Sequence, residues 1–464
     1  MPFHPTTEEW DADLTAGDPL GFPAYDEQRR ALAGSGESMR TGRTEHYAFI
    51  EGRFEVLGGT MGAAAGEKVV RAYDRARDLR LPMVVLTRTG GARLQEGMVA
   101  LVQLARTAAA ARRHAEAGLL SLAVYGSPTT GGVLASYASL VDVRAVVVGA
   151  VIGFAGPRVA EGTLGVPLPP GSHTAESVYE HGLADARLGA DDVAAWVEAV
   201  LGLTDRPLPI RSLPAWDAPA VGPGATTASE AWIEVLRSRA VGRPSGIDRA
   251  ARLCSSWVEL RGTDPTVRAG LARVGGRRCV VVATDRYCTA GRPTPAGFRL
   301  AQRAVGLAGR IGMPVATLVD TPGADPSPAA EVDGVASEIA RTLAALASCP
   351  TPTVSVCVGE GGSGGALALS YTDRLLMCEH ATFSVIAPEG AAAILERDAT
   401  KAADVAERLR LTSSDMLELG VVDEVIGEDQ DAIDEAVARA LQEATPGERD
   451  RRWDAVTARW LRPV

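Results

Sequence analysis

Two glycine-rich segments could carry chemistry, because each follows a short apolar run and precedes a helix-forming stretch. Residues 126–132 read GSPTTGG and residues 359–365 read GEGGSGG. The first amides of a helix have no partner within it, and the helix dipole adds partial positive charge there. Glycine also lets a bulky ligand approach the backbone closely. Each segment is therefore a candidate site for a negatively charged oxygen. Phosphate binding and tight backbone packing are the alternatives, although neither segment has the lysine of a P-loop.

Two further turns follow apolar runs and can complete these sites. Residues 89–93 read TGGAR, and residues 320–323 read DTPG. Such turns can supply a second amide to each site or form its wall. Arg93 is a candidate contact for a ligand phosphate or thioester, and an ion pair with Glu96 is the alternative. Without a P-loop, the DTPG string does not indicate a GTPase.

The candidate turns recur at a nearly constant spacing along the chain. Pro82 and Pro314 differ by 232 positions, as do Gly91 and Gly323, and the glycine pairs 131–132 and 364–365 differ by 233. A fourth landmark, Pro157 and Pro388, differs by 231. A duplicated domain explains this spacing.

The elements that position these turns follow from the apolar pattern. Strands are predicted at residues 83–86, 119–124, 315–319 and 354–358, and helices at 99–117 and 335–348. Alternation of short buried strands with helices predicts an α/β fold with parallel sheets and right-handed crossovers. We expect domains at residues 1–204 and 230–464, joined by a linker over residues 205–229, which is rich in proline, alanine and glycine.

The bulk composition narrows the class of protein. The formal charge is −11 with no basic run, which argues against nucleic acid and anionic membranes as partners. No apolar run reaches about 18 residues and the N-terminus does not resemble a signal peptide, so we expect a cytoplasmic protein. The six cysteines lack metal-site spacing and are expected to be reduced thiols, and no metal is predicted.

At these residues the sequence resembles the biotin-dependent carboxyltransferases, with the β and α subunits of the bacterial acetyl-CoA carboxylase enzyme joined in one chain. In the first half the resemblance rests on residues 58–62 (GGTMG), 66–68 (GEK), 90–96 (GGARLQE), 128–133 (PTTGGV) and 152–159 (IGFAGPRV). In the second half it rests on residues 319–324 (VDTPGA), 359–369 (GEGGSGGALAL) and 384–395 (SVIAPEGAAAIL).

This resemblance implies two tandem crotonase-like domains and a homodimer or higher oligomer, in which the first half of one chain faces the second half of another. It implies that the amides of Gly131 and Gly132 hold the thioester oxygen of an acyl-CoA. The amides of Gly365 and Ala366 would hold the ureido oxygen of carboxybiotin. The remaining substrate-binding positions it implies are Gly90, Gly91, Ala92, Arg93, Gly323 and Gly364.

The implied reaction moves a carboxyl group between carboxybiotin and an acyl-CoA of the acetyl or propionyl type. Backbone amides would stabilise the thioester enolate, and biotin itself would act as the base. No biotin-attachment Met-Lys-Met string occurs, so a biotin carboxyl carrier protein and a biotin carboxylase are implied as partners.

The chain departs from the family pattern at three places. The region before Thr41 has no cysteine for a zinc ribbon, residues 283–288 read ATDRYC where the family has GHQKGR, and Asp325 replaces a tyrosine. A decarboxylase of malonyl or methylmalonyl thioesters on the same scaffold is therefore the alternative function. A protein that only binds acyl-CoA would need one glycine turn, and this chain has two.

Overall fold

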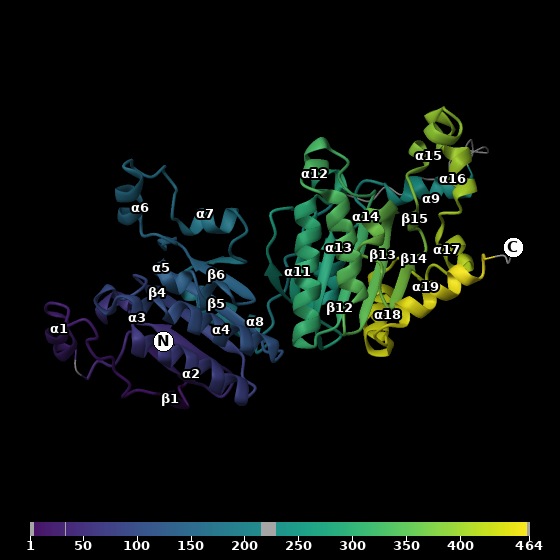
Figure 1. The fold of residues 1–464 in the computed structure, drawn as a ribbon. Coiled ribbons are helices and arrows are strands. Elements are labelled where there is room, and N and C mark those ends of the chain that lie inside the picture. Colours follow the sequence, from purple (N-terminus) through teal and green to yellow (C-terminus); the bar gives the residue numbers. More distant parts are fainter. Residues whose placement is uncertain (1–3, 33, 215–228, 462–464) are drawn as a thin grey trace. The chain divides into compact units, whose positions relative to one another are not determined.

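The computed structural model describes residues 4–32, 34–214 and 229–461 (Figure 1). The chain divides into two compact units, Met1–Thr204 (unit 1) and Asp205–Val464 (unit 2). Each unit is built around one mixed β-sheet covered by helices, and each is described here by itself.

The sheet of unit 1 has the strand order β1-β2-β3-β4-β5-β6-β8. Strand β2 is antiparallel to both β1 and β3, and the pairs from β3 to β8 are parallel. A short additional strand, β7, pairs with the end of β5. The bounds are β1 Glu8–Trp10, β2 Met39–Arg43, β3 Ala48–Gly52, β4 Met83–Thr89, β5 Ser121–Thr130, β6 Val143–Val147, β7 Ile152–Gly153 and β8 Ala186–Leu188.

Helices α2 and α4 pack against each other beside this sheet (Figure 1). The predicted helix at 99–117 is divided in the structure between α3 and α4. The core joins the buried face of α2 to the strands through residues such as Val69, Tyr73, Val85 and Tyr125. The helix bounds are α1 Tyr25–Ala31, α2 Ala63–Asp78, α3 Met98–Leu101, α4 Gln103–Glu116, α5 Gly131–Leu134, α6 Pro157–Leu164, α7 Ala175–Glu180 and α8 Val193–Leu201.

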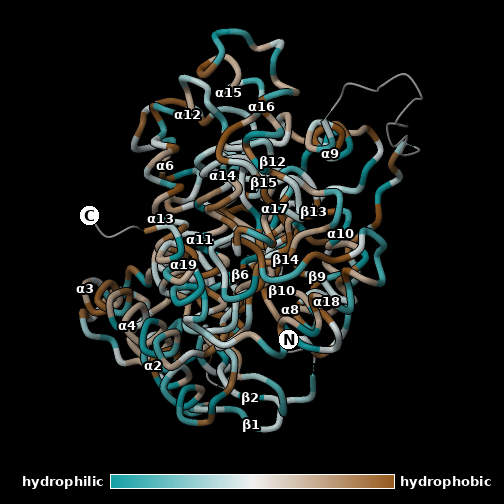
Figure 2. The backbone as a smooth tube through the Cα atoms, turned by 90° about the vertical axis from the view of Figure 1, so that its right-hand side faces the viewer, coloured by the Kyte–Doolittle hydropathy of each residue, from teal (hydrophilic) through white to brown (hydrophobic). Residues whose placement is uncertain are grey.

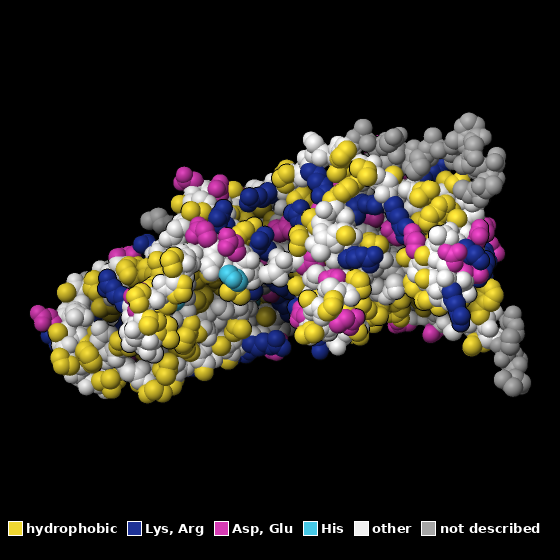
Figure 3. Space-filling model, turned by 90° about the horizontal axis from the view of Figure 1, so that it is seen from above, with side chains coloured by type: hydrophobic (Ala, Val, Ile, Leu, Met, Phe, Trp, Pro, Cys, Tyr) yellow, Lys and Arg dark blue, Asp and Glu magenta, His cyan; other side chains and the backbone are white. Residues whose placement is uncertain are grey.

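Helix α6 differs from the other long helices of unit 1 because it buries none of its residues. Hydrophobic side chains gather on the face of unit 1 that carries this helix (Figure 3). The exposed hydrophobic residues of α6 and its flanks are Phe154, Val159, Leu164 and Val166.

The sheet of unit 2 repeats this arrangement, with the strand order β9-β10-β11-β12-β13-β14-β16 and with β15 paired to the end of β13. Strands β9, β10 and β11 are antiparallel, and the pairs from β11 to β16 are parallel. The bounds are β9 Cys254–Leu260, β10 Val267–Val274, β11 Arg277–Thr284, β12 Val315–Thr321, β13 Thr353–Gly362, β14 Arg374–Cys378, β15 Thr382–Ser384 and β16 Glu424–Ile426.

Helices α11 and α13 lie side by side over the sheet of unit 2 (Figure 1), while α10 and α18 contact strands β11 to β13. Hydrophobic residues run along β14, whereas β1 and β2 of unit 1 are hydrophilic (Figure 2). The helix bounds are α9 Glu230–Ser238, α10 Gly246–Leu253, α11 Pro295–Ile311, α12 Pro328–Val332, α13 Val335–Ala347, α14 Ser363–Leu367, α15 Pro388–Leu395, α16 Ala402–Leu409, α17 Ser413–Leu419, α18 Gln430–Glu443 and α19 Glu448–Ala458.

The described part of the predicted linker packs onto unit 2. The backbone carbonyl of Arg206 accepts a 2.7 Å hydrogen bond from the amide of Trp257. The guanidinium of Arg211 binds Asp248 and Asp285, each at 2.7 Å. Residues 215–228 of the predicted linker lie outside the described residues.

All six cysteines are free thiols: five are buried and Cys288 is half-buried. No helix among the described residues is both long and apolar enough to cross a membrane.

Candidate active site

The duplication extends to the turns themselves. Gly91 and Gly323 both have positive φ, 103° and 128°. Each amide donates to a threonine hydroxyl two residues earlier, Gly91 to Thr89 at 2.9 Å and Gly323 to Thr321 at 3.1 Å. The equivalent positions in the two loops differ by 232 residues. Because they share the positive φ and the hydrogen bond to threonine, the two loops have the same local geometry.

Strands β5 and β13 run further than the apolar pattern predicts, to Thr130 and Gly362, and the helices start directly after them. The first residue of α5 is Gly131, with φ 67°, and the first residue of α14 is Ser363, with φ 55°. At the 232-residue spacing Gly131 therefore corresponds to Ser363, not to Gly364 as matching the glycine pairs suggests. The structural counterpart of Gly132 is Gly364.

In unit 1 the loop after β4 and the start of α5 touch through their backbones. A Cβ on Gly131 would lie 2.7 Å from the Cα of Gly91, so a side chain at this position would push the two segments apart. The amide of Gly131 donates to the carbonyl of Phe154 at 2.8 Å, and the amide of Gly90 donates to Gly58 at 2.9 Å. The amide of Gly131 thus has a partner within unit 1, whereas the amide of Gly132 is the next one of the helix and has no acceptor within it. The predicted contact of both amides with a thioester oxygen stays a prediction.

The amide of Ala92 points toward the side of the loop on which β5 and α5 lie. Met61 forms a parallel bridge with Ala92; its amide donates to Gly91 at 2.8 Å, and its carbonyl accepts from Arg93 at 3.0 Å. In a parallel ladder the residue between these two partners directs its own N–H and C=O to the opposite side. The Ala92 amide therefore faces away from Met61, toward the side of β5 and α5.

Unit 2 repeats this contact with different residues. The amide of Asp325 donates to the carbonyl of Pro293 at 2.9 Å, as Arg93 donates to Met61, so Ala324 takes the place of Ala92. A Cβ on Gly365 would lie 2.4 Å from the amide nitrogen of Ala324, so this nitrogen lies beside the start of α14. Gly364 is half-buried, Gly365 is buried and Ala366 is 0% exposed. The predicted contact of the Ala366 amide with a ligand stays a prediction.

Arg93 forms the ion pair with Glu96 that was the alternative to its predicted contact with a ligand. Its side chain is 1% exposed and forms ion pairs with the buried carboxylates of Glu37 and Glu96, at 3.2 Å from Glu96. Further donors reach Ser38 at 2.9 Å and the carbonyl of Thr60 at 2.8 Å. The guanidinium is therefore committed to neighbours in its own unit, which fixes the loop that carries Gly90, Gly91 and Ala92.

Glu96 connects this cluster to helix α2. One carboxylate oxygen accepts the amide of Ala63, the first residue of α2, and the other accepts the hydroxyl of Tyr25 at 2.6 Å. Burial and then the hydrogen bond to Glu96 raise the pKa of Tyr25 to about 12. Burial would raise the pKa of Glu37, but the hydrogen bonds and charge of Arg93 lower it. Both effects keep the hydroxyl protonated and the carboxylate charged at neutral pH.

Replacing Tyr25 with phenylalanine should lower the free energy of unfolding by about 1.5–3 kcal/mol, because a hydrogen bond to a buried charge is lost. Urea unfolding followed by circular dichroism measures the change. Tyr73→Phe is the matched control, because the buried Tyr73 hydroxyl has no hydrogen-bond partner in the described part of the chain. Equal destabilisation by both variants would contradict the role given to Tyr25.

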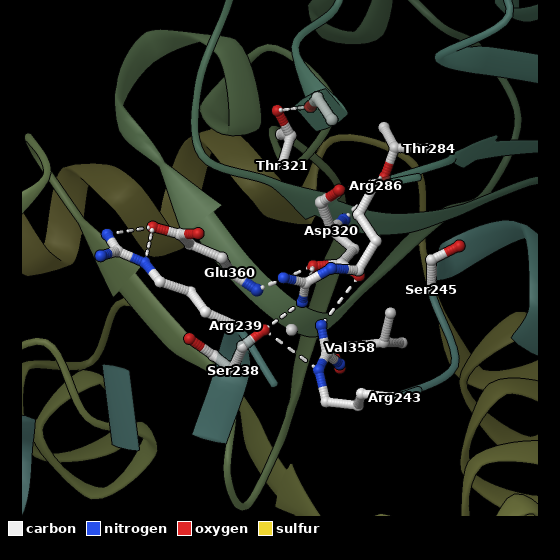
Figure 4. Close-up of polar contacts among 12 residues, drawn as sticks. Ser238, Arg239, Arg243, Ser245, Thr284, Arg286, Asp320, Thr321, Val358 and Glu360 are labelled. Carbon is white, nitrogen blue, oxygen red and sulfur yellow. Dashed lines mark hydrogen bonds and ion pairs between the residues drawn. The ribbon is translucent and has the colours of Figure 1, made fainter. Parts of the chain in front are cut away.

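In unit 2 a different buried arginine holds the equivalent loop (Figure 4). Arg243 and Asp320 are each 1% exposed, with Nη2 and Oδ2 2.8 Å apart. Arg243 also donates to the carbonyl of Val358 in β13. The second oxygen of Asp320 accepts the amide of Glu360 at 3.0 Å. This pair therefore ties the end of β12 to the glycine-rich end of β13.

The first glycine of the second turn, Gly359, leaves room for the ion pair between Arg243 and Asp320. A Cβ on Gly359 would lie 1.8 Å from Nη2 of Arg243 and 2.4 Å from Oδ1 of Asp320. At the next position, Glu360 binds Arg239 at 2.7 Å (Figure 4). Arg239 also binds Glu389 on α15. These two positions of the turn thus fix its backbone.

The positions that depart from the family pattern also have structural partners. The hydroxyl of Tyr287 donates to the carbonyl of Arg243 at 2.7 Å, and Asp285 binds Arg211. The carboxylate of Asp325 accepts the amide and hydroxyl of Ser327, both at 2.9 Å, just before α12. The side chains of Tyr287, Asp285 and Asp325 therefore all have hydrogen-bond or ion-pair partners within the protein.

Residues 30–192 match the family described as carboxyl transferase domain, and residues 226–446 match the acetyl co-enzyme A carboxylase carboxyltransferase-like family. The chain is 38% identical to the acetyl-coenzyme A carboxylase carboxyl transferase subunits beta/alpha of Parafrankia sp. (strain EAN1pec), over 95% of this chain and 81% of that protein. It belongs to the carboxyltransferases of biotin-dependent acyl-CoA carboxylases.

The carboxyltransferase is also 38% identical to a probable biotin-dependent acyl-coenzyme A carboxylase beta3 subunit of Mycobacterium bovis, over 93% of this chain and 88% of that protein. Among solved structures it is similar to transcarboxylase 12S, with a TM-score of 0.72 and 20% identity, over 92% of this chain and 83% of that one. The prediction of two tandem crotonase-like units is confirmed, as is the predicted enzyme class.

Proposed function

We propose that unit 1 of the carboxyltransferase binds the thioester of an acyl-CoA and stabilises its enolate. The observation that carries this assignment is the contact between Gly91 and Gly131, which brings the amides of Ala92 and Gly132 to the same side of the loop. Two converging amides form an oxyanion site, and losing one such donor typically costs about 10²–10³ in rate. Gly90 and Gly91 then shape the wall of this site.

Unit 2 binds the ureido oxygen of carboxybiotin in the corresponding position. Its amides are those of Ala324 and of the start of α14, at Gly364 and Gly365, and Gly323 provides the positive φ that the loop requires. A ureido oxygen that gains negative charge during carboxyl transfer needs the same stabilisation as an enolate oxygen. Two equivalent sites thus suit a reaction with two developing oxyanions.

The biotin is carried by a separate carrier protein, and the enzyme works with a biotin carboxylase as a homo-oligomer. The exposed hydrophobic residues of α6 support oligomerisation, because such patches on soluble proteins mark interaction sites. Transcarboxylase 12S assembles as a hexamer, in a structure with methylmalonyl-coenzyme A and methylmalonic acid bound. Its similarity supports a small acyl-CoA of the acetyl or propionyl type as the substrate.

The reverse reaction tests this function directly. The purified enzyme is incubated with malonyl-CoA or methylmalonyl-CoA and free biotin, and products are followed by mass spectrometry. We expect decarboxylated acyl-CoA and carboxybiotin in equal amounts, with no reaction when biotin is omitted. Release of CO2 from the thioester at the same rate without biotin would instead establish the decarboxylase alternative.

A further inference from the structure

A cavity of about 1340 Å³ opens in unit 1. Its walls include charged residues of the first strands, Glu9, Arg40 and Glu51, together with Lys68 of α2 and Arg88 of β4. Gly91, Gly131 and Gly132 are not among its described lining residues, so this cavity is distinct from the proposed oxyanion site. Its volume is sufficient for a nucleotide-sized molecule.

Lys68 is the unusual residue of this cavity. Of the 47 lysine and arginine residues in the chain, only Lys68 and Lys401 are lysines. The Lys68 side chain lines the cavity although the residue is only 1% exposed. Within the described ranges, no hydrogen bond or ion pair involves its ammonium group. Burying an ammonium group without a counter-ion costs free energy, so an anion bound beside Lys68 would stabilise it.

The acidic residues around Lys68 do not supply that anion, because arginines already neutralise them. Glu9, Glu37 and Asp11 are the carboxylates that favour the charged lysine, although burial outweighs them and lowers its pKa. Glu9 binds Arg40 at 2.9 Å, Asp11 binds Arg75 at 2.7 Å, and Glu37 binds Arg93. The ammonium therefore faces the cavity as a cation without a dedicated counter-ion.

We propose that this cavity binds a small molecule through a phosphate group held by Lys68. A lysine ammonium is a compact charge that suits phosphate. Arg88 lines the same cavity and adds positive charge, because no described ion pair involves it. Arg53 also lines the cavity, where it forms an ion pair with Glu55 at 3.4 Å. The phosphate belongs either to the coenzyme A part of the substrate or to a separate phosphorylated metabolite, since both carry the same group.

The two lysines allow a direct chemical test on the full-length enzyme. Pyridoxal 5′-phosphate forms an imine with an accessible amine, releasing water, and borohydride then fixes the label by reducing that imine. Pyridoxal carries the same aldehyde without the phosphate and is the matched reagent. Lys401, whose side chain is 50% exposed and lies 3.7 Å from Glu396, is the internal control. Labelling at each lysine is measured by peptide mass spectrometry.

At limiting reagent we expect at least a tenfold higher labelling of Lys68 by pyridoxal phosphate than by pyridoxal, with little difference at Lys401. Equal labelling of Lys68 by both reagents, or no labelling by either, would overturn the proposal. Inorganic phosphate, coenzyme A and dephospho-coenzyme A are then added as competitors. Protection by coenzyme A alone identifies the substrate's 3′-phosphate, and protection by inorganic phosphate identifies a site for the free group. Protection by none of the three would also refute a phosphate site.

Discussion

Replacing Gly365 with alanine should lower the rate of carboxyl transfer to biotin by about 10²–10³-fold, the cost of losing one oxyanion donor. The new Cβ would lie 2.4 Å from the amide nitrogen of Ala324 and 2.9 Å from the carbonyl carbon of Gly323. Both neighbours are backbone atoms, so the loop must move away from α14. The reverse reaction with malonyl-CoA and biotin measures the rate.

The same Gly365 variant should still bind acyl-CoA, because the proposed thioester site lies in unit 1. Isothermal calorimetry with acyl-CoA checks this separation. Gly306→Ala is the matched control in unit 2, since a Cβ at Gly306 meets no atom within 4 Å. Loss of acyl-CoA binding together with transfer in Gly365→Ala, at an unchanged melting temperature, would show that the two units do not divide the substrates as proposed.

Replacing Gly131 with alanine should reduce thioester turnover by a similar factor of about 10²–10³. Its φ of 67° is strained for alanine, and the Cβ would meet the Cα of Gly91 at 2.7 Å. The loop that carries the Ala92 amide would then separate from the Gly132 amide. Turnover of malonyl-CoA with saturating biotin is the measurement, and kcat is expected to fall more than KM rises.

Gly17→Ala is the control for Gly131→Ala, because Gly17 lies in unit 1 away from this turn and its Cβ would meet no atom within 4 Å. Gly132→Val is less informative: the first atom its side chain meets is the end of Leu104, at 2.7 Å, and this flexible group can move. Wild-type turnover in Gly131→Ala would refute an oxyanion site at this turn.

The duplication and the positions of the two turns could be predicted from the sequence, because both depend on local patterns of glycine and apolar residues. Glycine spacing and apolar runs predict a strand, a turn and a helix wherever they occur. The same reasoning misaligned the turns by one residue, since Ser363 adopts the left-handed conformation that Gly131 adopts. Backbone conformation, rather than glycine identity, defines the equivalent positions.

The residues that hold the turns in place could not be predicted. Arg93 meets Tyr25 and Glu37, which lie 68 and 56 positions away in the chain. Arg243 meets Asp320 in the same way. Only the spacing of Arg93 and Glu96 indicated an ion pair, and nothing local indicated that it would be buried. Gly359 belongs to the segment predicted to hold a ligand oxygen, and in the structure it makes room for Arg243.

The placement of the cysteines has a consequence for an enzyme that handles thioesters. A thiolate can capture an acyl group from coenzyme A, but a protonated thiol reacts far more slowly. Burial raises the pKa of Cys279 and of Cys378 to about 12, and burial and then the charge of Asp285 raise the pKa of the half-buried Cys288. Because these thiols stay protonated at neutral pH, they do not compete with the substrate's acceptor for its acyl group. Cys288, the one thiol that is not buried, offers a single position for attaching a spectroscopic probe.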